Sequence, residues 1–362
     1  MLFKKTTDSK NVYSRYIGKK WITLFAVALI LIVVALISVS VGSAGLPLSE
    51  IIRVFTGGGD ASSRTIIFNV RMPRIATGVA VGLALAMAGC IMQNVLRNPL
   101  ASASTLGIAQ GASFGAALAI VYFHAGVQIG PATAATITVT NPYMVTIFAF
   151  LGGVTSTVCI LLLSKVGGIT PASMILAGVA LSAMFTGGTA LVQYFADEVR
   201  VAAIVYWTFG NLGRAGWNEI SLIFILSAVA FVYFIFNRWN YNAMENGINT
   251  AKSLGVNVDA LILVSMAVAT LISAVAIAFV GTINFIGLIA PHIVRRFVGN
   301  DYRFLIPCSA LMGAVIMLGA DIASRMIAAP AILPIGALTS FLGAPLFLYL
   351  IIKKGKSRDD RS

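Results

Sequence analysis

Few side chains in this sequence could take part in chemistry, and the most informative of them are arginines. Arg71 and Arg74 stand three positions apart, and Asp321 stands four positions before Arg325. A guanidinium group holds a carboxylate in a fixed geometry through paired hydrogen bonds. We therefore expect Arg325 to be the partner of Asp321.

Motifs for nucleotide binding and metal-dependent hydrolysis are missing from the sequence. Its one Gly-Lys-Ser run is Gly355-Lys356-Ser357, and Leu350 stands where a phosphate-binding loop needs its first glycine. There is no HExxH segment, and the two histidines, His124 and His292, stand alone. The three cysteines are an odd number scattered through apolar stretches: Cys90, Cys159 and Cys308. The sequence therefore predicts that the chain is not an enzyme and binds no metal or cofactor of its own.

Composition places the chain in a membrane. Of the 362 residues, 59% are apolar and 10% charged, whereas a soluble domain is about half apolar and about a quarter charged. The apolar residues form runs of about 20, the length that crosses a bilayer as a helix. We therefore predict an all-α polytopic membrane protein with ten transmembrane helices. The predicted spans are 21–41, 75–96, 106–123, 142–164, 171–195, 220–236, 260–280, 283–297, 305–322 and 333–352.

The positions of the basic residues set the predicted topology. Lys and Arg are retained on the cytoplasmic side during insertion, and with the amino terminus inside, 18 of the 25 basic residues lie there. Both termini are then cytoplasmic, as a basic tail 1–20 and a tail 353–362 around one transmembrane domain, 21–352. The eighth segment, 283–297, is short and contains Pro291, so a re-entrant segment is the alternative; without this span the basic carboxyl tail would lie outside.

Two segments between the spans have patterns of their own. Segment 47–55 carries apolar residues at helical spacing with Glu50 and Arg53 on the other side, which predicts an interfacial helix on the outer face. An ordinary loop is the alternative. Segment 237–259 is the longest cytoplasmic connection, is polar, and has room for one or two short helices. A connection of this length favours a functional role.

Small residues recur every four positions on the second and third spans, which lets helix backbones approach closely. Tight packing is the first interpretation, and a pathway lining is the second. The candidate lining residues are Gln110 and Ser113 on the third span and Thr186 and Thr189 on the fifth. The last two flank a pair of glycines, and we expect a break in the helix there.

Several long motifs carry a resemblance to a known family. Residues 71–106 read RMPRIATGVAVGLALAMAGCIMQNVLRNPLASASTL, residues 281–299 read GTINFIGLIAPHIVRRFVG, and residues 333–350 read LPIGALTSFLGAPLFLYL. In these segments and their order, residues 20–354 resemble the permeases of bacterial iron-chelate and cobalamin ABC importers.

The resemblance implies a type II ABC importer permease fold and a set of partners. These are a second permease subunit, two cytoplasmic ATP-binding subunits that use ATP, an extracytoplasmic substrate-binding protein and the lipid bilayer, with no nucleic acid. Matching by motif, Arg71, Arg74 and Arg325 would dock against glutamates of the binding protein. The alternative is that these arginines anchor span ends at lipid headgroups.

The cytoplasmic connection is similar, over residues 246–258, to the coupling helices of the family, which sit in a groove of the ATPase. It departs in carrying Ile248 and Asn249 where an acidic pair is common. The residues that the resemblance implies for ATPase coupling are Gly247, Ala251, Lys252, Ser253, Leu254 and Gly255.

We therefore expect the permease subunit of an ATP-driven importer for an iron–siderophore complex, in a bacterial or archaeal cytoplasmic membrane. Haem and cobalamin are the alternative cargoes, and the second permease is either another copy or a paralogue. A stand-alone secondary transporter is the alternative of another class. It is disfavoured because every Asp and Glu falls outside the predicted spans or at an end of one. A membrane enzyme would need ionisable residues clustered at one depth, and the spans provide no such cluster.

Overall fold

The fold is described from a computed structural model of the chain. The structure describes residues 2–42, 46–123, 125, 128–129, 137–138, 141–167, 171–329 and 331–359. His124 lies outside these ranges. Within them the chain is helical apart from turns and one antiparallel pair of two-residue strands, β1 (Gln128–Ile129) and β2 (Ile137–Thr138).

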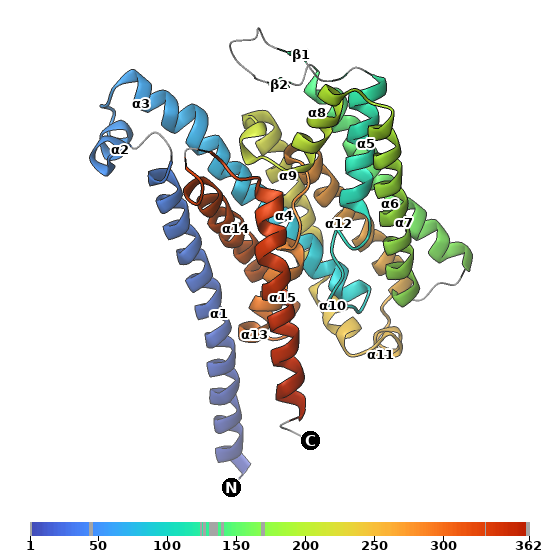
Figure 1. Ribbon diagram of the computed structural model, residues 1–362. Coiled ribbons are helices and arrows are strands. Elements are labelled where there is room, and N and C mark those ends of the chain that lie inside the picture. Colours follow the sequence, from blue (N-terminus) through green and yellow to red (C-terminus); the bar gives the residue numbers. More distant parts are fainter. Residues whose placement is uncertain are drawn as a thin grey trace.

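The helices form one elongated bundle with both chain termini at the same end (Figure 1). The short helices α10 and α11 lie toward that end, and α2, α3, α8 and the strand pair lie at the opposite end. We refer to these as the termini end and the far end. In chain order, the first helices are α1 (Leu2–Ser40), α2 (Leu48–Phe55), α3 (Ala61–Thr65), the π-helix η1 (Ile66–Arg71), α4 (Met72–Val95), α5 (Ile108–Tyr122), α6 (Pro142–Gly167) and α7 (Pro171–Tyr194). They are followed by α8 (Glu198–Thr208), the 3₁₀ turn η2 (Leu212–Arg214), α9 (Trp217–Phe236), α10 (Arg238–Glu245), α11 (Ile248–Ser253), α12 (Val258–Val280), α13 (Ile286–Val298), α14 (Tyr302–Met326) and α15 (Ile335–Asp359).

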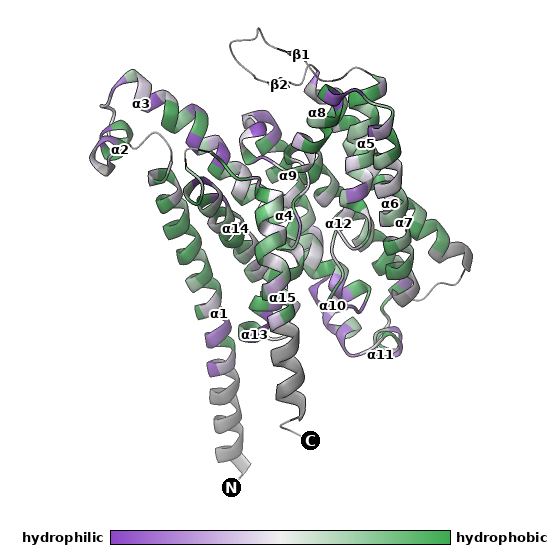
Figure 2. Cartoon of the chain, viewed as in Figure 1, coloured by the Kyte–Doolittle hydropathy of each residue, from purple (hydrophilic) through white to green (hydrophobic). Residues whose placement is uncertain are grey.

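Each of the ten predicted spans corresponds to a helix, but their lengths differ. Seven helical segments of the described chain are long and apolar enough to cross a membrane, while α5 and the apolar part of α15 are shorter. Helix α13, the predicted eighth span, has 13 residues, which at about 1.5 Å each is about 20 Å and less than the hydrocarbon thickness. Hydrophobic residues run along the bundle and hydrophilic ones gather toward its ends (Figure 2).

Several local expectations can be compared with the structure. A helix is present in segment 47–55 as α2, and the connection 237–259 contains two short helices, α10 and α11, as expected. Helix α1 starts at Leu2, so the segment predicted as a basic tail is helical. The sequence did not predict α8, because its 11 residues are too few for a span and carry two charges.

The predicted break in the fifth span is wrong. Helix α7 continues through residues 186–189, and the hydroxyl groups of Thr186 and Thr189 donate to the carbonyls of Ser182 and Phe185, each at 2.8 Å. Hydroxyl bonds of this kind to the preceding turn can bend a helix slightly, but they are compatible with a continuous one. Two adjacent glycines therefore weaken this helix without ending it.

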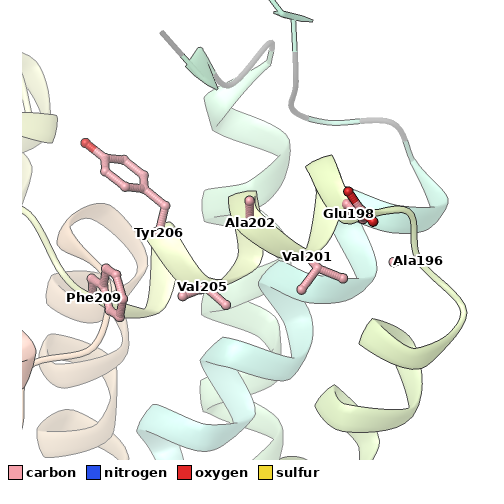
Figure 3. A pocket seen from close by; sticks show the side chains of 7 residues that line it. All are labelled: Ala196, Glu198, Val201, Ala202, Val205, Tyr206 and Phe209. Carbon is pink, nitrogen blue, oxygen red and sulfur yellow. The ribbon is translucent and has the colours of Figure 1, made fainter. Parts of the chain in front are cut away.

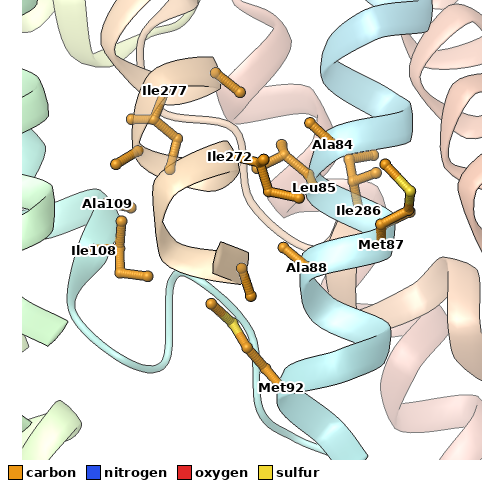
Figure 4. Packing of buried hydrophobic residues seen from close by; sticks show 14 of the residues in the cluster. Ala84, Leu85, Met87, Ala88, Met92, Ile108, Ala109, Ile272, Ile277 and Ile286 are labelled. Atoms are coloured by element: carbon orange, nitrogen blue, oxygen red, sulfur yellow. The ribbon is translucent and has the colours of Figure 1, made fainter. Parts of the chain in front are cut away.

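The core is built around α4, which packs against α9, α12, α13 and α14. Its residues from 84 to 95 are all buried, and Ala84, Leu85 and Met87 belong to one apolar cluster with Ile272 and Ile286 of the neighbouring helices (Figure 4). Glycines set the distances between helices here. A Cβ atom on Gly89 would collide with the backbone carbonyl of Gly287 on α13, which confirms the packing interpretation for this span.

This close approach predicts an asymmetric effect of adding one methyl group. In Gly89→Ala, α4 and α13 have to separate, and overpacking of this kind costs about 1–3 kcal/mol. In Gly187→Ala on α7, the added Cβ meets no atom within 4 Å, and a helical glycine replaced by alanine gains up to about 1 kcal/mol. Thermal unfolding of the purified protein in detergent should show a lower midpoint for Gly89→Ala and an unchanged or higher one for Gly187→Ala. Equal midpoints would contradict the packing described.

Candidate functional site

The far end of the bundle holds a buried ionic network centred on one aspartate. Asp321 of α14 is fully buried. Its Oδ2 lies 2.9 Å from Nη2 of Arg325, one turn further along the same helix, and its Oδ1 accepts a hydrogen bond of 2.8 Å from Nε of Arg74 on α4. The predicted pairing of Asp321 with Arg325 is confirmed. The second partner, Arg74, was not predicted, because the residues are 247 positions apart.

The position of Asp321 corrects one expectation. The sequence placed this acid at the end of the ninth span, but α14 continues to Met326, so Asp321 lies inside the helix and the carboxylate is buried. A buried charge is costly unless partners compensate it. Two guanidinium groups supply that compensation from two helices, which joins α4 to α14.

Arg325 and a further arginine, Arg71, close the carboxyl end of α1. Arg71, the last residue of η1, donates from Nη1 to the carbonyls of Val39 at 2.6 Å and Ser40 at 3.4 Å. Arg325 donates to the carbonyls of Ser38 and Val41 and, at 2.6 Å, to the hydroxyl of Ser38. The last carbonyls of a helix have no partner within it and carry partial negative charge, so cations stabilise them.

The network carries more positive than negative charge. It contains Arg71, Arg74 and Arg325 against Asp321 alone, and Nη2 of Arg71 is buried without a hydrogen-bond partner. Nearby, Arg214 of η2 lies 5.7 Å from the ring of Tyr206, and two of its nitrogens also lack partners. Burial lowers the pKa of Arg214 below its usual value. Sequence reasoning did not single out this arginine, because it belongs to no recognised motif.

The coupling segment lies toward the termini end, on α10 and α11 (Figure 1). Gly247 and Gly255 bracket α11 with φ angles of +120° and +81°, conformations that favour glycine. Ala251 is buried, and Lys252, Ser253 and Leu254 are exposed. Of the six coupling residues predicted from the sequence, two are glycines with a positive φ angle, one has a buried side chain and three have exposed side chains.

Helix α10 is fastened to the start of α14. Asn242 accepts a hydrogen bond of 2.9 Å from the backbone N–H of Tyr302 and donates to Asp301 at 3.5 Å, and Glu245 accepts one of 2.6 Å from Asn300. Lys20 of α1 contacts Asp301 at 3.1 Å. Burial raises the pKa of Asp301, but the hydrogen bonds and charges of Lys20 and Arg303 together outweigh it, so the pKa lies below its usual value.

The four candidate pathway residues lie on two neighbouring helices. Gln110 and Ser113 are half-buried on α5, while on α7 Thr189 is half-buried and Thr186 exposed. The helices meet through the rings of Phe114 and Phe185, whose centroids are 5.8 Å apart. The hydroxyl groups of Ser113, Thr186 and Thr189 each bond a carbonyl of their own helix, and the structure does not bring the α5 pair and the α7 pair together into one site.

A separate groove of about 500 Å³ runs along α8, the helix that the sequence did not predict. It is lined mainly by apolar side chains, with Glu198 and Tyr206 as its polar members (Figure 3). Nothing in the described part of the chain gathers three His, Cys, Asp or Glu residues into a metal site.

Comparison with known proteins decides the family. The sequence profile of the FecCD transport family matches residues 30–353. The chain belongs to the FecCD transport family. FhuB of Bacillus subtilis, named as an iron(3+)-hydroxamate import system permease, is 36% identical over 330 residues, 91% of this chain and 82% of FhuB. A protein of Methanocaldococcus jannaschii named for an ABC transporter permease is 50% identical over 349 residues, 96% of this chain and 99% of the relative.

A solved structure agrees with this assignment. The FecCD chain matches a metal-chelate type ABC transporter in an inward-facing conformation with a TM-score of 0.78 and 31% identity, over 91% of this chain and 98% of the other. The predicted all-α polytopic fold of an ABC importer permease is thereby confirmed. The FecCD protein is a multi-pass membrane permease of the ABC importers for iron chelates.

One serine-centred motif in the FecCD chain has no catalytic geometry. Gly111-Ala112-Ser113-Phe114-Gly115 has the Gly-x-Ser-x-Gly spacing of a hydrolase nucleophile, which requires a sharp turn between a strand and a helix. Ser113 instead lies inside α5, and its hydroxyl donates to the carbonyl of Ala109 at 3.1 Å. The two glycines serve close packing, because added Cβ atoms would collide with backbone on α6.

The far-end network predicts how a neutral replacement of its central acid acts. Asp321→Asn keeps the shape but leaves Arg74 and Arg325 without a compensating charge, and breaking a buried pair costs about 3–5 kcal/mol. We expect a markedly lower unfolding midpoint and a lower yield in membranes.

The matched control is Asp197→Asn. Asp197 pairs with Arg200 at 3.2 Å, but its side chain is 55% exposed, and an exposed pair contributes at most about 1 kcal/mol. Melting curves of the two variants that coincide would show that the buried network does not stabilise the fold.

Proposed function

We propose that this FecCD permease carries an iron–siderophore complex across the cytoplasmic membrane of a bacterium or archaeon. The observation that carries the proposal is the 36% identity to an iron(3+)-hydroxamate permease along 91% of the chain. Haem is the alternative cargo within the family, and cobalamin the next. The termini end is then the cytoplasmic end, in agreement with the excess of basic residues predicted there.

The work of transport comes from partner subunits. We propose two ATP-binding subunits, a second permease subunit and an extracytoplasmic binding protein as partners, with ATP used by the first of these alone. The ion pairs of Asp321 favour an ATP-driven importer over a secondary transporter, since both carboxylate oxygens lie against arginines. A carboxylate neutralised in this way is not available to bind a driving ion.

The arginines of the far end remain our candidates for docking the binding protein. Their excess of positive charge favours the approach of acidic groups, and complementary charge speeds and orients association. Because Arg74 and Arg325 already hold Asp321, a docking carboxylate would share or replace that partner. Docking would then change the ionic contacts that join α4, α14 and the end of α1.

The exposed side chains of α11 are our candidates for contact with the ATP-binding subunits. Movement of α11 reaches α10 and, through Asn242 and Glu245, the start of α14. Helix α14 carries Asp321 toward its other end. One continuous helix therefore links the coupling segment to the far-end network.

Reconstitution into liposomes tests the source of energy and the cargo together. With the ATP-binding subunits, the binding protein and ATP, we expect uptake of a ferric hydroxamate above that of haemin and cobalamin. With the permease alone and an imposed proton or sodium gradient, we expect none. Uptake driven by the gradient alone would overturn the assignment of work to the partners, and faster haemin uptake would change the cargo.

A charge placed on α11 tests the coupling surface. Leu254 is 69% exposed, so Leu254→Asp should leave the permease folded while lowering its co-purification with the ATP-binding subunits several-fold, because a carboxylate would be desolvated in that contact. Ile332→Asp, an exposed apolar residue of the loop before α15, is the matched control and should not affect co-purification. Equal binding by both variants would remove Leu254 from the interface.

A further inference from the structure

A cavity of about 730 Å³ lies at the far end between α1, α2 and α4. Its lining is apolar apart from Ser40, whose hydroxyl is already engaged with the carbonyl of Leu36. A ligand held here would find no polar group to orient it. The cavity therefore suits hydrocarbon and excludes a polar or charged cargo.

Amphipathic helix α2 fixes the depth of the cavity in the membrane. Its Ile51 and Val54 are buried, and Ile52 and Phe55 line the cavity, while Glu50 and Arg53 form its polar side. A helix with this division lies at the boundary between headgroups and acyl chains. The cavity beneath it is consequently within the hydrocarbon of one leaflet.

The cavity is continuous with the lipid-facing surface of α1. Ile32, Leu36 and Ile37 line the cavity and are also exposed, and further exposed apolar residues precede them along this span. Ile52 and Phe55 are likewise more than half exposed although they are large and apolar. An unfilled space would forfeit dispersion contacts along every wall, and lipid chains are the hydrocarbon available at this depth.

We propose that one hydrocarbon chain of a membrane lipid occupies this cavity, inserted between α1 and α4 under α2. The chain would support the outer half of α1, which packs against α14 but only slightly against α4, and whose end is held by Arg71 and Arg325. This is a structural lipid site, separate from the cargo pathway, and it does not depend on which chelate is carried.

Photolabelling tests the proposal on the full chain in nanodiscs. With a phospholipid that carries a diazirine on one acyl chain, mass spectrometry should find Ile52 and Phe55 labelled several-fold above Val33, an exposed residue of α1 outside the cavity. Ala35→Trp fills the cavity and should reduce that labelling several-fold, whereas Val33→Trp should not. If Ala35→Trp fails to fold, the smaller substitution Ala35→Leu takes its place and must also reduce the labelling of Ile52 and Phe55.

Two results would overturn the lipid site. One is labelling of Ile52 and Phe55 that does not exceed that of Val33 or does not respond to the substitutions at Ala35. A second test replaces Ile52 by the photoreactive residue benzoylphenylalanine. The proposal predicts that irradiation gives a covalent adduct with lipid. A covalent dimer in its place would assign the cavity to a second copy of the chain.

Discussion

The charge of a single buried carboxylate constrains the far end of this permease. Asp321 is removed from water, and only the guanidinium groups of Arg74 and Arg325 make its charge tolerable there. Since these groups come from α4 and α14, the two helices are fixed to each other at that level. Arg325 then reaches the last carbonyls of α1, so the outermost helix is held by the same centre.

Between the ends, the bundle is held by close packing and not by charge. Glycines on α4, α5, α6 and α13 let backbones approach so closely that no side chain fits between them. In a membrane the hydrophobic effect gives little preference for helix association, so dispersion contacts at short range carry it. Such interfaces change between discrete arrangements more readily than they deform, which suits a transporter that alternates between two states.

Helix α14 connects these two kinds of interaction. At the termini end its first turn is bonded to α10 through Asn242, and at the far end it carries Asp321. A continuous helix with a polar contact near each end can transmit displacement along its axis. This geometry offers a physical route for coupling between the proposed ATPase-contacting segment and the proposed docking surface.

The sequence by itself determined the membrane environment, the positions of the ten helical segments, the amphipathic helix α2 and the Asp321–Arg325 pair. These depend on local composition or on residues one turn apart, and both are visible along the chain. It also carried the motifs that place the protein in its family. It gave a wrong break at Thr186–Thr189, because glycine lowers helix propensity while the surrounding helix contacts override it.

Only the tertiary structure decided the second partner of Asp321, the capping of α1 by arginines, and the cavity under α2. Arg74 and Asp321 are 247 positions apart, and no periodicity relates residues at such a separation. The length of α13 and the presence of α8 were likewise decided in three dimensions, where each helix ends according to the neighbours that satisfy its terminal groups. Contacts between distant segments depend on how the helices pack, and a hydropathy pattern specifies which face is apolar without specifying its partner.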